Sequence, residues 1–427
     1  MTYPTTYYSN TKADDFARPA LEEEISADVA IIGGGLAGLS AALQLSRAGR
    51  KIVVLEAESI GFGASGRNGG FVSLGFSTSS EAIAARAGMD AAKALHKLSI
   101  EGVDFVRQNI EALGIAQAQM SPGIMSVRRY DDGDNLKRFA EQLYRDYGYR
   151  IDFLETAETR NILNSKRYFQ SVRDPSAFHI HPLNYLRALG REIERLGGRI
   201  FEHSRAVGLD DRGSGKRVRT AKGGVDAETV LIATGGYTDG LVPQLRRAYL
   251  PIVTYVMVSE EAPDLIASAI RTSCAIGDNR RAGDYYRIVD NGRRLLWGGR
   301  ITTRAADTPG VISELRSEMV GTYPQLVSLK TELAWSGFMS YARHLMPQIG
   351  KLDRSTWYCT AFGGHGLNTT AIGGKVVAEA ICGQSDRYRL FDKFGLVWAG
   401  GAAGLAAAQL TYWKLQMQDW LNERKAR

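Results

Sequence analysis

The chain has 427 residues, of which 44% are hydrophobic and 23% charged, and its formal net charge at pH 7 is +7. These values are typical of a globular protein long enough for two domains. Lysine and arginine are scattered without a long basic block, which argues against nucleic acid or anionic lipid as the partner. The opening MTYPTTYYSN lacks a signal-peptide pattern, and Cys274, Cys359 and Cys382 form no CxxC motif. We therefore expect reduced thiols and a cytoplasmic location.

The first predicted unit, residues 28–56, is a strand, a glycine-rich turn, a helix and a second strand. The turn reads Gly33-x-Gly35-x-x-Gly38, and the second strand, KIVVLE, ends at Glu56. Strand, turn, helix and terminal acid together are typical of the βαβ dinucleotide-binding fingerprint. We expect a pyrophosphate at the helix N-terminus and adenosine ribose hydroxyls on the Glu56 carboxylate. An acid here would repel a 2′-phosphate, which disfavours NADP and leaves NAD and FAD open.

A second glycine-rich loop, GFGASGRNGGF, follows directly at residues 61–71. It places a hydroxyl (Ser65), a guanidinium (Arg67) and an amide (Asn68) among small residues. A loop of this kind can wrap a pyrophosphate and continue along the cofactor. The alternative interpretation is a surface glycine loop without a ligand.

A hairpin is predicted in DYYRIVDNGRRLLWGGRITTR, residues 284–304, with Asn291-Gly292 as its two-residue turn. This register gives two faces. The apolar one contains Tyr286, Ile288, Leu295 and Trp297, and the other contains Tyr285, Arg287 and Arg300. A bulge at Gly298-Gly299 would change this assignment.

Two segments near the end of the chain are unusual. In FGGHGLNTT, residues 362–370, three glycines surround His365 and a helix follows. The exposed N–H groups at such a helix start favour negative charge. Residues 394–413 carry no charge and are long enough to cross a bilayer, but they consist mostly of Ala and Gly. We favour a buried or docked segment before a C-terminal helix over membrane contact.

Four segments together resemble the FAD-dependent amine and amino-acid oxidases, the family of D-amino-acid oxidase, glycine oxidase and sarcosine oxidase. They are the fingerprint with its terminal acid, GASGRNGG (63–70), ETVLIATGGYT (228–238) and WYCTAFGGHGLNTTAIGGKVVAEAI (357–381). The opening residues together with ASGRNGG look closest to the gamma-glutamylputrescine oxidase branch. Bacterial iminodiacetate oxidase is another member that the resemblance suggests.

The resemblance implies an α/β fold, more fully an α+β two-domain flavoprotein. A Rossmann-like FAD-binding domain would contain an inserted substrate domain with an antiparallel sheet. The FAD-binding domain would be discontinuous, formed by residues 25–75, 180–240 and 348–385. The substrate domain would comprise residues 76–179 and 241–347, and a C-terminal segment, residues 386–427, would end in a helix.

The resemblance also implies a FAD site. Its expected contacts are Gly33, Gly35, Leu36, Ala37, Gly38, Glu56, Ala57, Gly63, Ala64, Ser65, Arg67, Asn68, Gly69, Val207, Thr234, Gly235, Gly364, Gly366, Leu367 and Asn368. The GGHG loop would face the pyrimidine end of the flavin, where its N–H groups stabilise the negative charge of reduction. His365 either adds a donor there or is only fixed by a local hydrogen bond. We expect the FAD to be non-covalent, because GASGRNGG has no Cys or His and Cys359 lies in an apolar strand.

In this family one face of the hairpin sheet covers the flavin, with substrate between them. Arg287 and Arg300 are therefore candidates for binding a substrate carboxylate, with Tyr285 beside them. The alternative is a charged face in solvent. The chain departs from the family at Met339, where amino-acid oxidases place a carboxylate-binding arginine; Arg343 and His344 follow later. The run LLWGGRI also lacks the oxygen-activating lysine of sarcosine oxidases, which leaves oxygen activation open.

These features predict an enzyme that oxidises the C–N bond of a carboxylate-bearing secondary or N-substituted amine. Glycine derivatives, iminodiacids and gamma-glutamyl amines fit this description. The imine would hydrolyse to an aldehyde or keto acid and an amine, and O2 would give H2O2. His365, Arg300, Arg287 and Tyr285 are the candidate catalytic residues, and no metal site is expected. One alternative is a dehydrogenase that passes electrons to a quinone or partner docked on residues 394–413. Another is a basic flavoprotein that binds nucleic acid, although no basic stripe with interleaved aromatics occurs.

Overall fold

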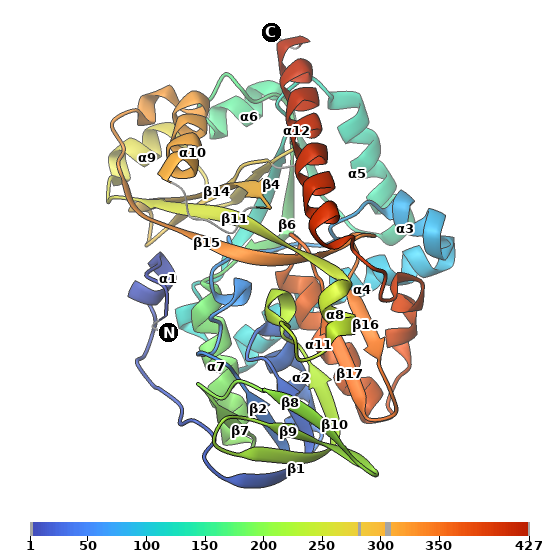
Figure 1. Ribbon diagram of the computed structural model, residues 1–427. Coiled ribbons are helices and arrows are strands. Elements are labelled where there is room, and N and C mark those ends of the chain that lie inside the picture. Colours follow the sequence, from blue (N-terminus) through green and yellow to red (C-terminus); the bar gives the residue numbers. More distant parts are fainter. Residues whose placement is uncertain (1–2, 281–282, 304–308, 426–427) are drawn as a thin grey trace.

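The protein is described here from a computed structural model covering residues 3–280, 283–303 and 309–425 (Figure 1). Two sheets lie one above the other in the view of Figure 1, and the chain passes back and forth between them. The predicted fold class is confirmed: one sheet is Rossmann-like and the other is mainly antiparallel. The three cysteines are free thiols, as expected.

The first sheet has eight strands in the order β16-β17-β10-β1-β2-β7, with β9 paired to β10 and β8 to β9. Strands β7, β2, β1, β10 and β17 run parallel to one another. Their central residues are apolar and buried on both faces, as in sheets covered on both sides. The strands are β1 (Glu24–Ile32), β2 (Ile52–Leu55), β7 (Arg199–Phe201), β8 (Gly208–Arg212), β9 (Gly215–Arg219), β10 (Gly224–Ile232), β16 (Gln348–Lys351) and β17 (Thr356–Thr360).

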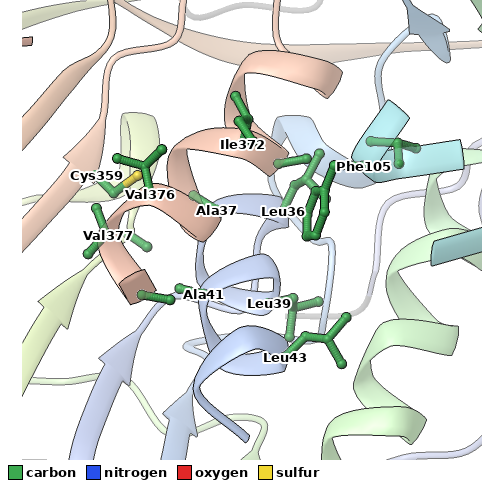
Figure 2. Packing of buried hydrophobic residues seen from close by; sticks show 14 of the residues in the cluster. Leu36, Ala37, Leu39, Ala41, Leu43, Phe105, Cys359, Ile372, Val376 and Val377 are labelled. Atoms are coloured by element: carbon green, nitrogen blue, oxygen red, sulfur yellow. The ribbon is translucent and has the colours of Figure 1, made fainter. Parts of the chain in front are cut away.

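Four helices build the main core on one face of this sheet: α2 (Leu36–Arg47), α4 (Met89–Ala112), α7 (Pro182–Arg195) and α11 (Leu367–Ile381). Figure 2 shows apolar side chains of α2 and α11 in this core, with Cys359 of β17 beside Val376 and Val377. The α2–α11 crossing is close, because a Cβ on Gly374 would lie 2.4 Å from the Ala37 carbonyl oxygen. The middle of α11 is thereby fixed against the start of α2.

The second sheet has nine strands in the order β15-β11-β14-β13-β12-β4-β6-β3, with β5 paired to β6. All pairs are antiparallel except β4 with β12. The short β3 falls within residues 25–75, which were expected in the FAD-binding domain, yet it pairs with β6. The strands are β3 (Phe71–Val72), β4 (Ser121–Val127), β5 (Asp152–Leu154), β6 (Ser171–His179), β11 (Tyr249–Ser259), β12 (Ala275–Asp278), β13 (Tyr285–Val289), β14 (Arg294–Thr302) and β15 (Thr331–Ala342).

Helices α9 (Pro263–Ala269) and α10 (Pro309–Thr322) cover the outer face of the second sheet, where they pack on Tyr286 and Trp297 (Figure 1). The predicted hairpin register is confirmed, with Tyr286 opposite Trp297 and Tyr285 opposite Gly298. The remaining helices are α1 (Tyr7–Asn10), α3 (Ser80–Ala87), α5 (Gly133–Tyr147), α6 (Thr156–Ile162) and α8 (Pro243–Arg247).

The chain ends in a 3₁₀ helix, η5 (Arg387–Phe394), and the long helix α12 (Gly401–Lys425), which lies along the outside of the molecule (red in Figure 1). Residues 394–413 were expected to be buried or docked. The helical part is docked, because α12 has no buried residue but hydrogen-bonds to β14 and to the residue after it. It is docked by one side only. Among the described residues, no helix is long and apolar enough to cross a membrane.

Candidate active site

A cavity of about 870 Å³ lies between the two sheets. It falls within the usual range for sites that bind organic ligands. Most of the residues expected to contact FAD or substrate line it: Gly33, Gly35, Leu36, Ala37, Glu56, Ala57, Gly63, Ala64, Ser65, Arg67, Asn68, Gly69, Val207, Thr234, Gly235, Gly364, Gly366, Leu367, His365, Tyr285 and Arg300. Three expected residues, Gly38, Asn368 and Arg287, do not.

The fingerprint turn brings the start of α2 to the cavity wall. Gly33 has φ +116°, and a Cβ there would lie 2.6 Å from the Ala233 carbonyl oxygen. Gly38 contributes by packing alone, since its Cβ would lie 2.0 Å from the Gly33 carbonyl oxygen. Only glycine fits either place. The turn therefore presents the N–H groups of a helix start to the cavity, an arrangement suited to a pyrophosphate.

Glu56 follows β2 at the same edge of the sheet. Its carboxylate accepts the N–H groups of Gly34, at 2.7 Å, and Glu58, at 2.9 Å. Burial raises the pKa of Glu56, while these two N–H groups act in the opposite direction. The backbone thus fixes the orientation of the carboxylate. Each oxygen keeps a lone pair for a further donor such as a ribose hydroxyl.

The loop at residues 61–70 is held by its own side chains. The Asn68 amide donates to the carbonyls of Ala64 and Ser65 and accepts the Gly70 N–H, so it shapes the loop. The Ser65 hydroxyl accepts the Leu36 N–H at 3.0 Å, at the first residue of α2.

Arg67 is buried in the cavity wall. Its guanidinium donates to the Tyr237 hydroxyl at 2.8 Å and the Ser336 carbonyl at 3.3 Å, and it lies over the Phe62 ring. No carboxylate pairs with it among the ion pairs of the described residues. A buried guanidinium with neutral partners favours a bound anion.

Val207 was expected to bind adenine through its backbone. It lines the cavity, but its N–H already donates to the Arg219 carbonyl at 2.8 Å.

The GGHG loop leads into α11 at the opposite wall. His365 Nε2 lies 3.0 Å from the Ser73 carbonyl oxygen, so this nitrogen carries the proton. Burial lowers the pKa of His365 and keeps the ring neutral. Its one N–H is thus used locally, which favours the interpretation of a fixed side chain over that of an extra donor. The Asn368 side chain donates to the Ser99 carbonyl and points away from the cavity.

Arg287 is in a different place from the one expected. The hairpin register is right, but the side chain is only 3% exposed and lies behind the cavity wall. Its guanidinium donates to the carbonyls of Gly69 and Ile180 and to the Tyr8 hydroxyl, and it contacts His179 Nδ1 at 3.1 Å. The expectation that Arg287 meets substrate is therefore wrong. No sequence pattern predicted that the N-terminal residues would bring the Tyr8 hydroxyl to this guanidinium.

Arg300 borders the cavity, but a bulge changes its direction. On β11, Thr254 pairs with Ile301 and Tyr255 with Gly299, which leaves Arg300 as the extra residue with φ +58°. Its guanidinium donates to Glu318 of α10 at 3.1 Å and lies 3.5 Å from Glu314. The bulge falls one residue beyond the Gly298-Gly299 position considered from the sequence. Arg300 Nε still has no hydrogen-bond acceptor among the described residues.

The wall formed by the second sheet contains two phenols. Tyr285 packs its ring against Gly298, where a Cβ would lie 2.2 Å away. Tyr341, which sequence reasoning missed, is hydrogen-bonded to the backbone of Gly364, and burial raises its pKa to about 12. Burial also raises the pKa of Tyr285. Both phenols therefore stay protonated at neutral pH, and Met339 lies in the same wall.

A fingerprint turn that faces a cavity beneath an antiparallel sheet defines a two-domain, dinucleotide-dependent oxidoreductase. The chain matches the family described as FAD dependent oxidoreductase (DAO) over residues 28–380, and it belongs to that family. The resemblance seen in the sequence is thus confirmed. The protein is a FAD-dependent oxidoreductase of the group that acts on amines and amino acids.

Individual relatives agree with this assignment. The gamma-glutamylputrescine oxidoreductase of Escherichia coli strain K12 is 35% identical over 92% of each chain. Glycine oxidase from Geobacillus kaustophilus has the same fold, with a TM-score of 0.72 at 18% identity over 87% of this chain and 99% of the other. Iminodiacetate oxidase from Chelativorans sp. BNC1 gives a TM-score of 0.68 at 16% identity, covering 84% of this chain and 98% of the other.

The cavity residues fit FAD. The helix start suits its pyrophosphate, and the fixed Glu56 carboxylate suits its ribose. The Arg67 guanidinium, whose hydrogen-bond partners among the described residues are neutral, suits an anionic group. When bound, FAD supplies the two-electron redox chemistry. The protein itself supplies binding, orientation and the electrostatic environment.

Proposed function

We propose that the protein oxidises the C–N bond of a carboxylate-bearing secondary or N-substituted amine and that O2 is the electron acceptor, with H2O2 as product. The imine product would hydrolyse to an aldehyde or keto acid and an amine. Gamma-glutamyl amines, iminodiacids such as iminodiacetate, and N-substituted glycines have the required groups. The name of the Escherichia coli relative favours the gamma-glutamyl amines among them.

The observation that supports this proposal is the distribution of charge along the cavity. The carboxylates that line it, Glu56, Glu58 and Asp239, belong to the loops of the first sheet, at the nucleotide end. Among the described residues, the wall from the second sheet has Tyr285, Tyr341 and Arg300 but no carboxylate. A wall with hydrogen-bond donors and no acid favours an acidic substrate.

The substrate amine must be neutral to give up hydride. In the part of the chain that the structure describes, the wall of the second sheet has no carboxylate that would hold the amine as ammonium, and its phenols are neutral. Arg300 Nε lies 3.5 Å from Glu314 but makes no hydrogen bond among the described residues, and Arg300 lines the cavity. We propose that Arg300 and the phenols orient the carboxylate, which places the C–N bond over the flavin.

We propose that FAD is bound without a covalent link. Cys359 lines the cavity, but burial raises the pKa of its thiol, so the thiolate that would attack a flavin does not form at neutral pH. Acid precipitation should release the yellow flavin into the supernatant. Colour that stays in the pellet of the wild type but not of Cys359→Ala would show a thioether link instead.

A peroxide assay on matched pairs of amines tests the activity. Gamma-glutamylputrescine would be compared with putrescine, and N-methylglycine with dimethylamine, so that each pair differs in the acidic group. We expect H2O2 only with the acidic members. Equal peroxide from both members of every pair would contradict the proposal.

A dehydrogenase is the second candidate, because α12 exposes an apolar face on which an electron acceptor could dock. Turnover with an electron-accepting dye but without peroxide in air would favour this alternative.

A further inference from the structure

Helix α12 exposes five large apolar side chains. Trp413, Met417 and Trp420 are 54%, 58% and 54% exposed, and Leu410 and Leu421 are exposed as well. Their spacing of three or four residues, with Leu421 next to Trp420, places them on one side of the helix. Trp398, just before the helix, is also exposed. We call Leu410, Trp413, Met417, Trp420 and Leu421 the outer face of α12.

The other side of α12 is half-buried and contacts the body of the protein, with Leu405, Ala408 and Leu415 interspersed among its polar residues. The Tyr412 hydroxyl accepts the Ile301 N–H, and Gln409 Oε1 accepts the Thr303 N–H. Glu423 pairs with Arg129 Nε at 2.8 Å, and the Arg129 side chain is almost fully buried. Contacts along its length therefore fix the rotation of the helix, with the outer face toward solvent. A helix that only covered the sheet would have the reverse arrangement.

The exposed charges of α12 are all basic. They are Lys414, Arg424 and Lys425, while the acids Asp419 and Glu423 are half-buried. The Arg424 guanidinium lies over the Trp420 ring. Three basic residues are thus placed beside the outer face of this helix.

We propose that the outer face of α12 binds the surface of an anionic phospholipid bilayer, with the helix lying in the plane of the interface. Tryptophan prefers the headgroup region, and basic residues beside an apolar helix face attract anionic lipids. The helix does not span the bilayer, since it is not long and apolar enough.

The charges favour lipid over a second copy of the chain. A two-fold pair of α12 helices would bring two sets of Lys414, Arg424 and Lys425 to one interface without an exposed acid from either helix. Anionic headgroups supply the missing negative charge. The inference does not depend on which amine the enzyme oxidises.

Sedimentation of the full-length holoenzyme with vesicles tests the proposal. The vesicles would be phosphatidylcholine alone, or an equal mixture with phosphatidylglycerol. We expect binding to the mixed vesicles and at least about tenfold weaker binding to phosphatidylcholine alone. Binding should be lost in about 1 M salt, where the Debye length is roughly 3 Å. Tryptophan emission should shift to the blue on binding.

Two variants separate the contribution of the apolar side chains to vesicle binding from that of the basic side chains. Trp413→Ser/Met417→Ser/Trp420→Ser should bind mixed vesicles at least about tenfold more weakly. Lys414→Glu/Lys425→Glu should remove the preference for anionic lipid. The matched control is Phe139→Ser/Tyr144→Ser on another helix, α5, where both side chains are exposed. This control should bind as the wild type does, and all variants should keep their flavin absorbance.

Several results would overturn the proposal. They are absence of wild-type binding to either vesicle, equal binding by the triple variant, or equal loss of binding in the α5 control. A wild type that does not bind vesicles but forms a dimer that the triple variant loses would assign the outer face to a second copy. If the triple variant does not fold, the charge-reversal variant decides: an unchanged preference for anionic vesicles contradicts the proposal.

Discussion

The two ends of the cavity are built in different ways. At the nucleotide end, the first sheet contributes glycine backbone, a helix start and the Glu56 carboxylate, whose direction two backbone N–H groups fix. At the other end, the second sheet contributes side chains: Tyr285, Tyr341, Met339 and Arg300. The nucleotide end therefore depends on the path of the chain. The other end, which we propose for the substrate, depends on side chains.

This difference predicts how substitutions at each end of the cavity affect flavin binding and activity. Changes at the nucleotide end should remove the flavin and with it all activity. Changes at the substrate end should leave the flavin in place and alter the choice of amine.

Gly38→Val should have the largest effect. A Cβ at this position would lie 2.0 Å from the Gly33 carbonyl oxygen, so α2 cannot pack on β1. We expect complete loss of bound flavin, measured as the ratio of flavin to protein absorbance. The control is Gly240→Ala, where a Cβ meets nothing within 4 Å and the residue also lines the cavity. Normal flavin content in Gly38→Val would show that close packing of α2 on β1 at Gly38 is not needed for flavin binding.

Arg287→Met should lower stability and leave the substrate pocket in place. Loss of the guanidinium leaves the buried carbonyls of Gly69 and Ile180 without this donor. We expect the free energy of unfolding to fall by roughly 2–4 kcal/mol, measured by urea unfolding of the holoenzyme. KM of the remaining folded enzyme should stay near that of the wild type. A large rise in KM without a loss of stability would return Arg287 to the substrate site.

Two buried histidines beside Arg287 should make the protein sensitive to acid. Burial, and then the charge of Arg287, lower the pKa of His179 and of His181 to about 3. Unfolded histidine binds its proton near pH 6.5, so below this value the unfolded state binds more protons and stability falls toward pH 3.

Each of these histidines should cost about 2 kcal/mol of unfolding free energy between pH 6.5 and 5. Urea midpoints measured across this range check the slope. Because the Arg287 charge contributes to both shifts, the slope should be smaller in Arg287→Met. A midpoint that does not change between pH 7 and 5 would contradict this prediction.

Arg300→Met should affect substrate and not cofactor. Loss of one charge-assisted contact to a carboxylate costs roughly 1.5–3 kcal/mol, which raises KM for an acidic amine about ten- to a hundredfold. Flavin content should be unchanged. Arg293→Met is the matched control, since Arg293 lies at the exposed hairpin turn and pairs with Asp290. Equal KM values for Arg300→Met and the control would exclude Arg300 from the carboxylate site.

The sequence predicted the parts of the site that local rules determine. The fingerprint turn, Glu56 and the hairpin register all depend on neighbouring residues, and the structure has each of them as expected. The two-sheet fold followed from the family resemblance, and the family assignment is confirmed. The turn, the position of Glu56 and the hairpin register can be predicted without knowing which distant residues contact them.

The positions of the two arginines could not be predicted in this way. Arg287 has the expected register, but Tyr8 and His179, far away in the sequence, surround its guanidinium. Arg300 is the extra residue of a bulge, and its guanidinium pairs with Glu318 of α10. Long-range packing and one extra residue in a strand decide whether a side chain reaches a cavity. Local sequence patterns show neither the long-range packing nor the position of the extra residue.

Anaerobic mixing of the holoenzyme with one amine pair tests the central claim most directly, because flavin bleaching reports C–N oxidation whatever the electron acceptor. Gamma-glutamylputrescine should bleach the flavin absorbance, and putrescine at the same concentration should do so at least about tenfold more slowly, the loss expected for one charge-assisted contact. Bleaching at the same rate by both amines, or by neither these nor the iminodiacid and glycine derivatives, would contradict the account.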